Sequence, residues 1–88
     1  MISVEAIDNN SFKVSVTKDS STEHIVLLSD RFHQDVTNNK LSKTELITRS
    51  FEFLLKRESN QSILKKFNLE VISQYFPEYI DEIKKIIL

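Results

Sequence analysis

The stretch from Leu41 to Glu58, LSKTELITRSFEFLLKRE, constrains the fold more than any other part of the chain. Ser42 and Glu45 have the S-x-x-E spacing of a capping box, in which each side chain accepts a hydrogen bond from a free backbone N–H of the first turn. The apolar residues that follow cover an arc of about 200° on the helical wheel, which is wider than a one-sided surface helix needs. The stretch therefore predicts a helix from Ser42 to Glu58 that is buried on two sides, for example between a sheet and a second helix or a partner subunit.

Three stretches before this helix show the alternation of apolar and polar residues that is typical of strands. They cover 2–6, 12–17 and 22–28, and the turn-forming clusters DNNS and KDSS separate them. The third stretch, TEHIVLL, ends with apolar residues on both faces, as expected of a central strand or of a strand at an interface. Short turns between successive strands favour an antiparallel meander.

Short helices are predicted on both sides of the long helix. Ser29 is a suitable N-cap for a helix that runs through Val36. The apolar residues of 63–67 fit about one helical turn, and Asn68 is placed to cap another short helix. Pro77 suits the first position of a final helix because its missing N–H would have no partner there.

The apolar period changes from two to about 3.6 near Ser29. Strands first and helices afterwards is the order of an α+β fold. We therefore expect one small domain over 1–88. Its N-terminal three-stranded antiparallel sheet, a meander over 1–28, is packed by the central amphipathic helix and by two or three shorter helices within 29–88.

Composition excludes several classes of function. The 88 residues include neither cysteine nor glycine, and the net charge is −1. Without cysteine there are no disulfides, thiolate zinc sites or thiol catalysis, which suits a cytoplasmic protein. Without glycine there are no glycine-rich phosphate loops. The charge gives no indication of a nucleic-acid partner, and the longest apolar run is too short to cross a membrane.

Two resemblances carry different implications. The segment from Arg49 to Tyr79, with RSFEFLLKRE, SIL and YFPEY, resembles a family of short bacterial proteins that carry no assigned activity, so it implies no mechanism. The order of strand TEHIVLL, helix SDRFHQDV and helix SKTELITRSFEFLLKRE over 22–58 is similar to a ribbon–helix–helix DNA-binding unit.

In ribbon–helix–helix proteins a strand pairs with its twin from a second subunit and enters the major groove. The resemblance implies that Thr22, His24 and Val26 face base edges of DNA. It also implies a dimeric regulator or antitoxin as the alternative function of this chain.

The residue types used in catalysis lack a suitable arrangement. His24 and His33 are nine residues apart, and no pattern supplies the further ligands that a metal site needs. Ser29, Asp30 and His33 are close in sequence, but Ser29 is more simply explained as a helix cap. We expect no catalytic residue, no bound metal and no cofactor.

Five residues are candidate contacts for a protein partner. Arg57 lies inside the apolar arc of the long helix, so its guanidinium must reach water, pair with a carboxylate of the C-terminal helix, or face a partner. Aromatic residues and arginine are enriched in interface hot spots, although an aromatic cluster also suits the core of a helix–helix corner. The candidates are Arg49, Arg57, Tyr75, Phe76 and Tyr79.

The sequence thus predicts a non-catalytic cytoplasmic binding module that contacts a protein partner or a second copy of itself. The over-wide apolar arc and the doubly apolar strand support this prediction, because exposed apolar area normally marks an interface. The two functions make different demands on 22–28. Pairing within the chain favours the binding module, and pairing across a dimer favours the DNA-binding alternative.

Overall fold

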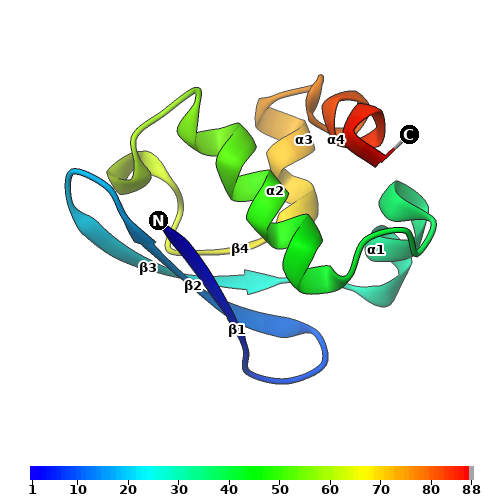
Figure 1. The fold of residues 1–88 in the computed structure, drawn as a ribbon, viewed down its shortest axis with the longest axis horizontal. Coiled ribbons are helices and arrows are strands. Elements are labelled where there is room, and N and C mark those ends of the chain that lie inside the picture. Colours follow the sequence, from blue (N-terminus) through cyan, green and yellow to red (C-terminus); the bar gives the residue numbers. More distant parts are fainter. Residues whose placement is uncertain (88) are drawn as a thin grey trace.

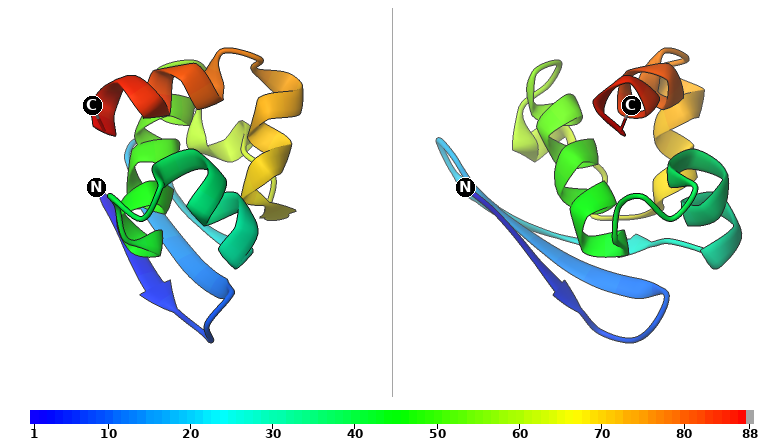
Figure 2. Two further views of the ribbon diagram at one scale, coloured as in Figure 1. Left: turned by 90° about the vertical axis from the view of Figure 1, so that its right-hand side faces the viewer. Right: turned by 45° about the vertical axis from the view of Figure 1, so that its right-hand side comes forward.

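The computed structural model describes residues 1–87 and confirms the α+β class, with a sheet on one side and helices on the other (Figure 1 and Figure 2). The strands are β1 (Ile2–Ala6), β2 (Ser11–Thr17), β3 (Ser21–Leu27) and β4 (Lys66–Asn68). The helices are α1 (Asp30–Thr37), α2 (Lys43–Leu55), α3 (Ile72–Tyr75) and α4 (Tyr79–Ile87), with 3₁₀ turns η1 (Asn60–Ser62) and η2 (Leu69–Val71). Among residues 1–87, no helix has the length and apolar character needed to cross a bilayer.

The sheet has the order β1-β2-β3-β4. The first three strands form the predicted antiparallel meander, in which Val14 pairs with Val4 on one side and with His24 on the other. β4 is an addition to the predicted sheet: it pairs parallel to β3, with Phe67 beside Val26.

The prediction of a helical turn over 63–67 is wrong. Ile25 donates its N–H to the Lys65 carbonyl over 2.7 Å, and the His24 ring bonds to the Leu64 carbonyl over 2.8 Å. Helices this short have little stability of their own, because the first turn fixes several residues for one hydrogen bond. Hydrogen bonds to the edge of β3 therefore determine the conformation of 63–67, which is extended and not helical.

The capping box of α2 is formed as predicted. Ser42 Oγ accepts from the Glu45 N–H over 3.1 Å, and Glu45 Oε1 accepts from the Ser42 N–H over 3.0 Å. The helix ends at Leu55 rather than at Glu58, because the next residues turn back toward the sheet. Both Arg57 and Glu58 donate their N–H groups to the carbonyl of Leu54.

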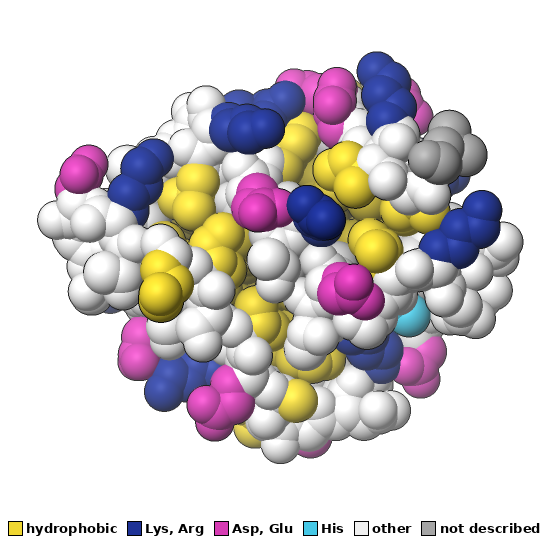
Figure 3. Space-filling view, in the orientation of Figure 1, with side chains coloured by type: hydrophobic (Ala, Val, Ile, Leu, Met, Phe, Trp, Pro, Cys, Tyr) yellow, Lys and Arg dark blue, Asp and Glu magenta, His cyan; other side chains and the backbone are white. Residues whose placement is uncertain are grey.

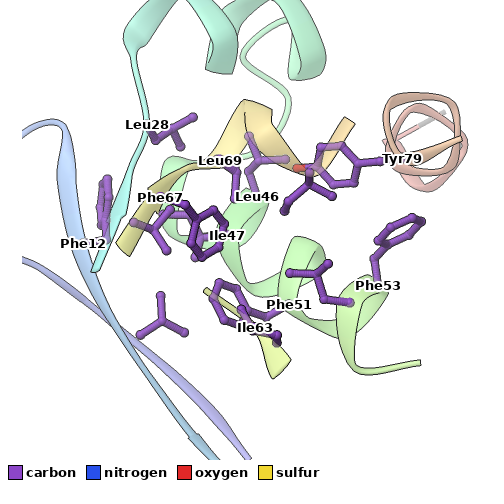
Figure 4. Close-up of a cluster of buried hydrophobic side chains, with 14 of the residues drawn as sticks. Phe12, Leu28, Leu46, Ile47, Phe51, Phe53, Ile63, Phe67, Leu69 and Tyr79 are labelled. Atoms are coloured by element: carbon purple, nitrogen blue, oxygen red, sulfur yellow. The ribbon is translucent and has the colours of Figure 1, made fainter. Parts of the chain in front are cut away.

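The core lies between the inner face of the sheet and α2, and it continues to the C-terminal helices (Figure 4). Phe51 is buried with its ring 5.4 Å from the His24 ring and 6.1 Å from the Phe67 ring. On another side of α2, the Phe53 ring lies 5.3 Å from the Tyr79 ring at the start of α4. The wide apolar arc of α2 is thus covered by both a sheet and a second helix, as its width predicted.

The short helices also follow local signals. Ser29 caps α1, because its Oγ accepts the N–H of Phe32 over 3.1 Å. α1 ends where Asn38 and Asn39 adopt positive φ angles of 50° and 61°, a conformation that asparagine tolerates better than most residues. α4 begins two residues later than Pro77, a difference within the usual scatter of helix boundaries.

Candidate functional site

A half-open pocket lies where the C-terminal end of α2, the segment after η1, β4 and α3 meet. Its volume is about 230 Å³. We name it the apolar pocket; its lining is Leu54, Glu58, Ser62, Leu64, Phe67, Val71, Ile72, Tyr75 and Phe76. Two large lining residues are unusually exposed for apolar side chains, Leu64 at 48% and Tyr75 at 67%. They form the rim of the pocket.

Backbone hydrogen bonds hold the Leu64 part of this rim in place. The His24 ring and the Ile25 N–H bond to the successive carbonyls of Leu64 and Lys65, which keeps this segment extended. Because successive side chains of an extended chain point to opposite sides, burial of Ile63 directs Leu64 outward. The hydrogen bonds between this segment and β3 therefore keep the Leu64 side chain exposed.

The polar groups of the pocket are few. Glu58 is half-buried, and Ser62 Oγ lies 3.2 Å from Ser59 Oγ. Within 1–87, no three His, Asp or Glu side chains converge in a way that would hold a metal ion. The lining is therefore suited to apolar contact with a small polar component.

The two histidines have structural roles. A carbonyl oxygen only accepts, so His24 donates from Nδ1 to Leu64. His24 Nε2 then accepts from Thr22 Oγ1 over 2.9 Å, and Asn60 Nδ2 donates to the same Thr22 oxygen over 3.1 Å. This chain of hydrogen bonds ties β3 to η1 and to the segment that leads into β4. His33 Nε2 bonds instead to the carbonyl of Leu41, on the other side of the molecule.

Of the three roles considered for Arg57, the structure shows pairing with a carboxylate of the same chain. Its guanidinium carbon lies 3.6 Å from the centre of the Phe53 ring, and Nη1 donates to the Phe53 carbonyl over 3.0 Å. Its Nε also lies 3.5 Å from a carboxylate oxygen of Glu78, directly before α4. Arg57 therefore joins the end of α2 to the start of α4.

Tyr79 is fully buried, so the prediction that it contacts a partner is corrected. Ser50 donates to the Leu46 carbonyl over 2.7 Å, which leaves the Ser50 oxygen to accept from the Tyr79 hydroxyl at 2.5 Å. Burial raises the pKa of the Tyr79 hydroxyl well above its ordinary value of 10.0. Tyr79 is thus part of the core at the corner between α2 and α4, whereas Tyr75 and Phe76 are not fully buried.

The remaining predicted contacts lie on two surfaces. Tyr75 and Phe76 both line the apolar pocket. Arg49 lies on the exposed side of α2, where its Nη1 is 3.5 Å from a carboxylate oxygen of Glu52, in a different groove that also contains Val4. The sequence pattern does not indicate Leu64 and Val71 as site residues, because it predicts a helical turn around Leu64 and a short helix around Val71.

The predicted DNA contacts are not available on the surface. His24 and Val26 are 1% and 0% exposed, and Thr22 is half-buried under Asn60. β3 pairs with β2 along one edge and, from Ile25 to Leu27, with β4 along the other, so it is an inner strand of the chain's own sheet. This prediction is corrected, because the ribbon–helix–helix arrangement requires a free strand.

Comparisons with known families, with curated proteins and with solved structures found no match to this chain. The resemblance to short bacterial proteins therefore stays a prediction. The surfaces described above are what support a functional proposal.

Proposed function

We propose that the chain is a non-catalytic binding module of the cytoplasm, which acts by taking an apolar side chain of a protein partner into the apolar pocket. The observation that carries this proposal is the exposed rim of Leu64 and Tyr75 around an apolar hollow. A large apolar side chain gains about 1.5–3 kcal/mol when it moves from water into an apolar environment. Covering the rim and filling the hollow would therefore stabilise a complex.

The size of the pocket favours a side chain over a free small molecule. Sites for small molecules usually enclose about 300–1,000 Å³, whereas this pocket holds about 230 Å³. Interface hot spots often consist of one aromatic or aliphatic anchor in a pocket of this kind. Glu58 in the lining favours a hydrogen-bond donor or a basic group next to the anchor.

Substitution of the rim tests the proposal, with a displayed library of random short peptides as the probe. Peptides selected on the wild-type chain should share an apolar anchor. Their Kd should rise by about tenfold or more, or ~1.4 kcal/mol, in Leu64→Ala and in Tyr75→Ala. Both side chains are exposed, so neither variant should unfold the domain.

Ile86 provides the matched control because it is an apolar residue on α4 with 51% exposure and does not line the pocket. Ile86→Ala should leave the Kd of the selected peptides unchanged. Peptides that bind equally well to wild type and to both rim variants would contradict the proposal.

A further inference from the structure

β1 is an edge strand whose outer backbone groups have no strand beside them within 1–87. The residues on either side of β1 bond toward β2: Met1 and Thr17 exchange N–H···O=C bonds of 2.6 and 2.9 Å, and the Ile7 N–H donates to the Ser11 carbonyl over 2.8 Å. In the register of the two strands, Ser3 and Glu5 are the residues of β1 that continue this series. In an antiparallel pair these bonds alternate along the strand. The N–H and C=O groups of the even-numbered residues from Ile2 to Ala6 therefore point away from the sheet.

This edge lacks the features that usually protect an edge strand. The opposite edge, β4, is only three residues long, which is one common form of protection. β1 has five residues, no proline, and Glu5 as its single charge. Exposed apolar side chains lie beside both of its ends, Met1 at 90% and Ile7 at 56%.

A groove of about 400 Å³ lies at this edge, between Val4 in the middle of β1 and the side of α2. The α2 wall of this edge groove consists of Thr44, Glu45, Thr48, Arg49 and Glu52. β1 lies at the front of Figure 1 with α2 beside it. Figure 3 looks onto the same face and shows charged side chains of both signs next to hydrophobic ones.

We propose that the edge groove binds one extended segment of a protein partner, which adds to the sheet as a fifth strand beside β1. Main-chain groups of the segment would complete the hydrogen bonds of Ile2, Val4 and Ala6, as in other cases of strand addition. This site is separate from the apolar pocket and goes beyond the function proposed for it. Either site can exist without the other.

Sterics favour a lone segment over a second copy of the chain. α2 packs against β1 itself. If two β1 strands paired across a two-fold axis, they would lie about 4.8 Å apart, and each would bring its own α2 to the same face of the joined sheet. Packed helices need about 8–10 Å between their axes. A segment without an accompanying helix meets no such obstacle.

The charges around the edge groove indicate the chemistry of the segment. Glu45 and Glu52 line the groove from α2. Glu5 flanks it on the outer face of the sheet, opposite Lys13 of β2, which lies 3.3 Å from Glu23. Arg49 is the basic residue of the lining, and it already lies 3.5 Å from Glu52. The excess of carboxylates favours a segment that carries lysine or arginine.

Val4→Pro tests the proposal, because it removes an outward N–H while the bonds from β1 to β2 come from its neighbours. Val4→Ala is the matched control, since it shortens the same side chain and keeps the N–H. The probe is the displayed library of random short peptides. We expect a class of basic peptides whose Kd rises more than about tenfold in Val4→Pro, and changes little in Val4→Ala or in the pocket variant Tyr75→Ala.

Hydrogen exchange of the wild-type chain with a selected peptide gives a second readout that does not depend on any variant. Exchange of the Ile2, Val4 and Ala6 amides should slow markedly on binding. The proposal is overturned if no peptide class responds to Val4→Pro and these amides stay unprotected. A wild-type dimer that Val4→Pro converts to monomer would also overturn it, because a second copy would then occupy the edge. If peptides fail to bind the apolar pocket but still bind the edge groove, only the function proposed for the pocket is contradicted.

Discussion

At the scale of single residues, Phe51 contributes most clearly to the core. Its side chain is fully buried against His24 of β3 and Phe67 of β4. Truncation of such a residue to alanine typically costs ~3–5 kcal/mol, from lost transfer energy and from the cavity left behind. A small domain has a total stability near the lower end of ~5–15 kcal/mol. Phe51→Ala should therefore leave the chain largely unfolded near physiological temperature, as measured by thermal melts.

Glu52 is the matched control one position along α2. It is exposed, and its ion pair with Arg49 is at the surface, where such pairs contribute little. Glu52→Ala should change the free energy of unfolding by less than about 0.5 kcal/mol. Equal melting temperatures for the two variants would mean that the buried face of α2 is assigned wrongly.

Tyr79 should make stability sensitive to alkaline pH. Burial raises the pKa of its hydroxyl above the ordinary 10.0, so in that range the unfolded chain releases a proton that the folded chain retains. The free energy of unfolding should then fall as pH rises above about 10, by up to ~1.4 kcal/mol per pH unit. Below that pH the full stability is present.

Urea unfolding of wild type and Tyr79→Phe measures this effect. The variant loses the bond to Ser50 and should be less stable than wild type by ~1 kcal/mol at neutral pH. The difference should shrink above about pH 10, because the variant has no buried phenol to retain its proton. A difference that stays constant with pH would contradict this account of Tyr79.

The sequence predicted which side chains are buried better than it predicted which side chains form hydrogen bonds with each other. The wide apolar arc of α2 was sufficient to place Phe51 in the core, because helical geometry fixes which side chains share a face. No local pattern indicated that the Tyr79 hydroxyl would find Ser50, 29 residues earlier. The sequence therefore leaves two readings open for Tyr79, a partner contact and the core of a helix corner.

At the scale of elements, the link between β3 and the segment after α2 holds the apolar pocket in shape. Asn60 is 3% exposed, and its Nδ2 donates to the Ser20 carbonyl over 3.0 Å and to Thr22 Oγ1 over 3.1 Å. Asn60→Ala removes both bonds from a buried site and should cost ~1–3 kcal/mol. Asn60→Asp should be at least as harmful at neutral pH, because a carboxylate cannot donate to Ser20.

Chemical denaturation of these variants beside Gln61→Ala measures the effect, since Gln61 is an exposed neighbour in the same 3₁₀ turn. Gln61→Ala should lie within about 0.5 kcal/mol of wild type. If Asn60→Ala were as stable as Gln61→Ala, the link between β3 and η1 would contribute nothing to the fold.

Elements with strong local signals were predictable, and β4 was not. The capping box of α2 and the alternation in β2 are contained within a few residues, so the sequence indicates them directly. β4 exists because its backbone meets β3, and the bond from His24 to Leu64 spans 40 residues. The apolar pocket depends on this long-range pairing, so the sequence alone did not indicate Leu64 as a site residue.

At the scale of the whole molecule, the exposed large apolar side chains of residues 1–87 are distributed unevenly. Leu64 and Tyr75 form the rim of the apolar pocket, Met1 and Ile7 flank β1, and Ile86 lies alone on α4. The inner face of the sheet and the helices form one continuous core. The two proposed contact surfaces therefore lie around that core, at the C-terminal end of α2 and at the free edge of the sheet.

Chemical-shift mapping of the labelled chain with a selected peptide tests most directly whether the apolar pocket is a protein-contact surface. Saturating the wild-type chain with a peptide that carries an apolar anchor should shift the amides of Leu64, Val71 and Tyr75 most strongly, and Tyr75→Ala should weaken that titration by about tenfold. Shifts concentrated on the outer face of the sheet or on α4, with the pocket amides unchanged, would contradict the proposed function.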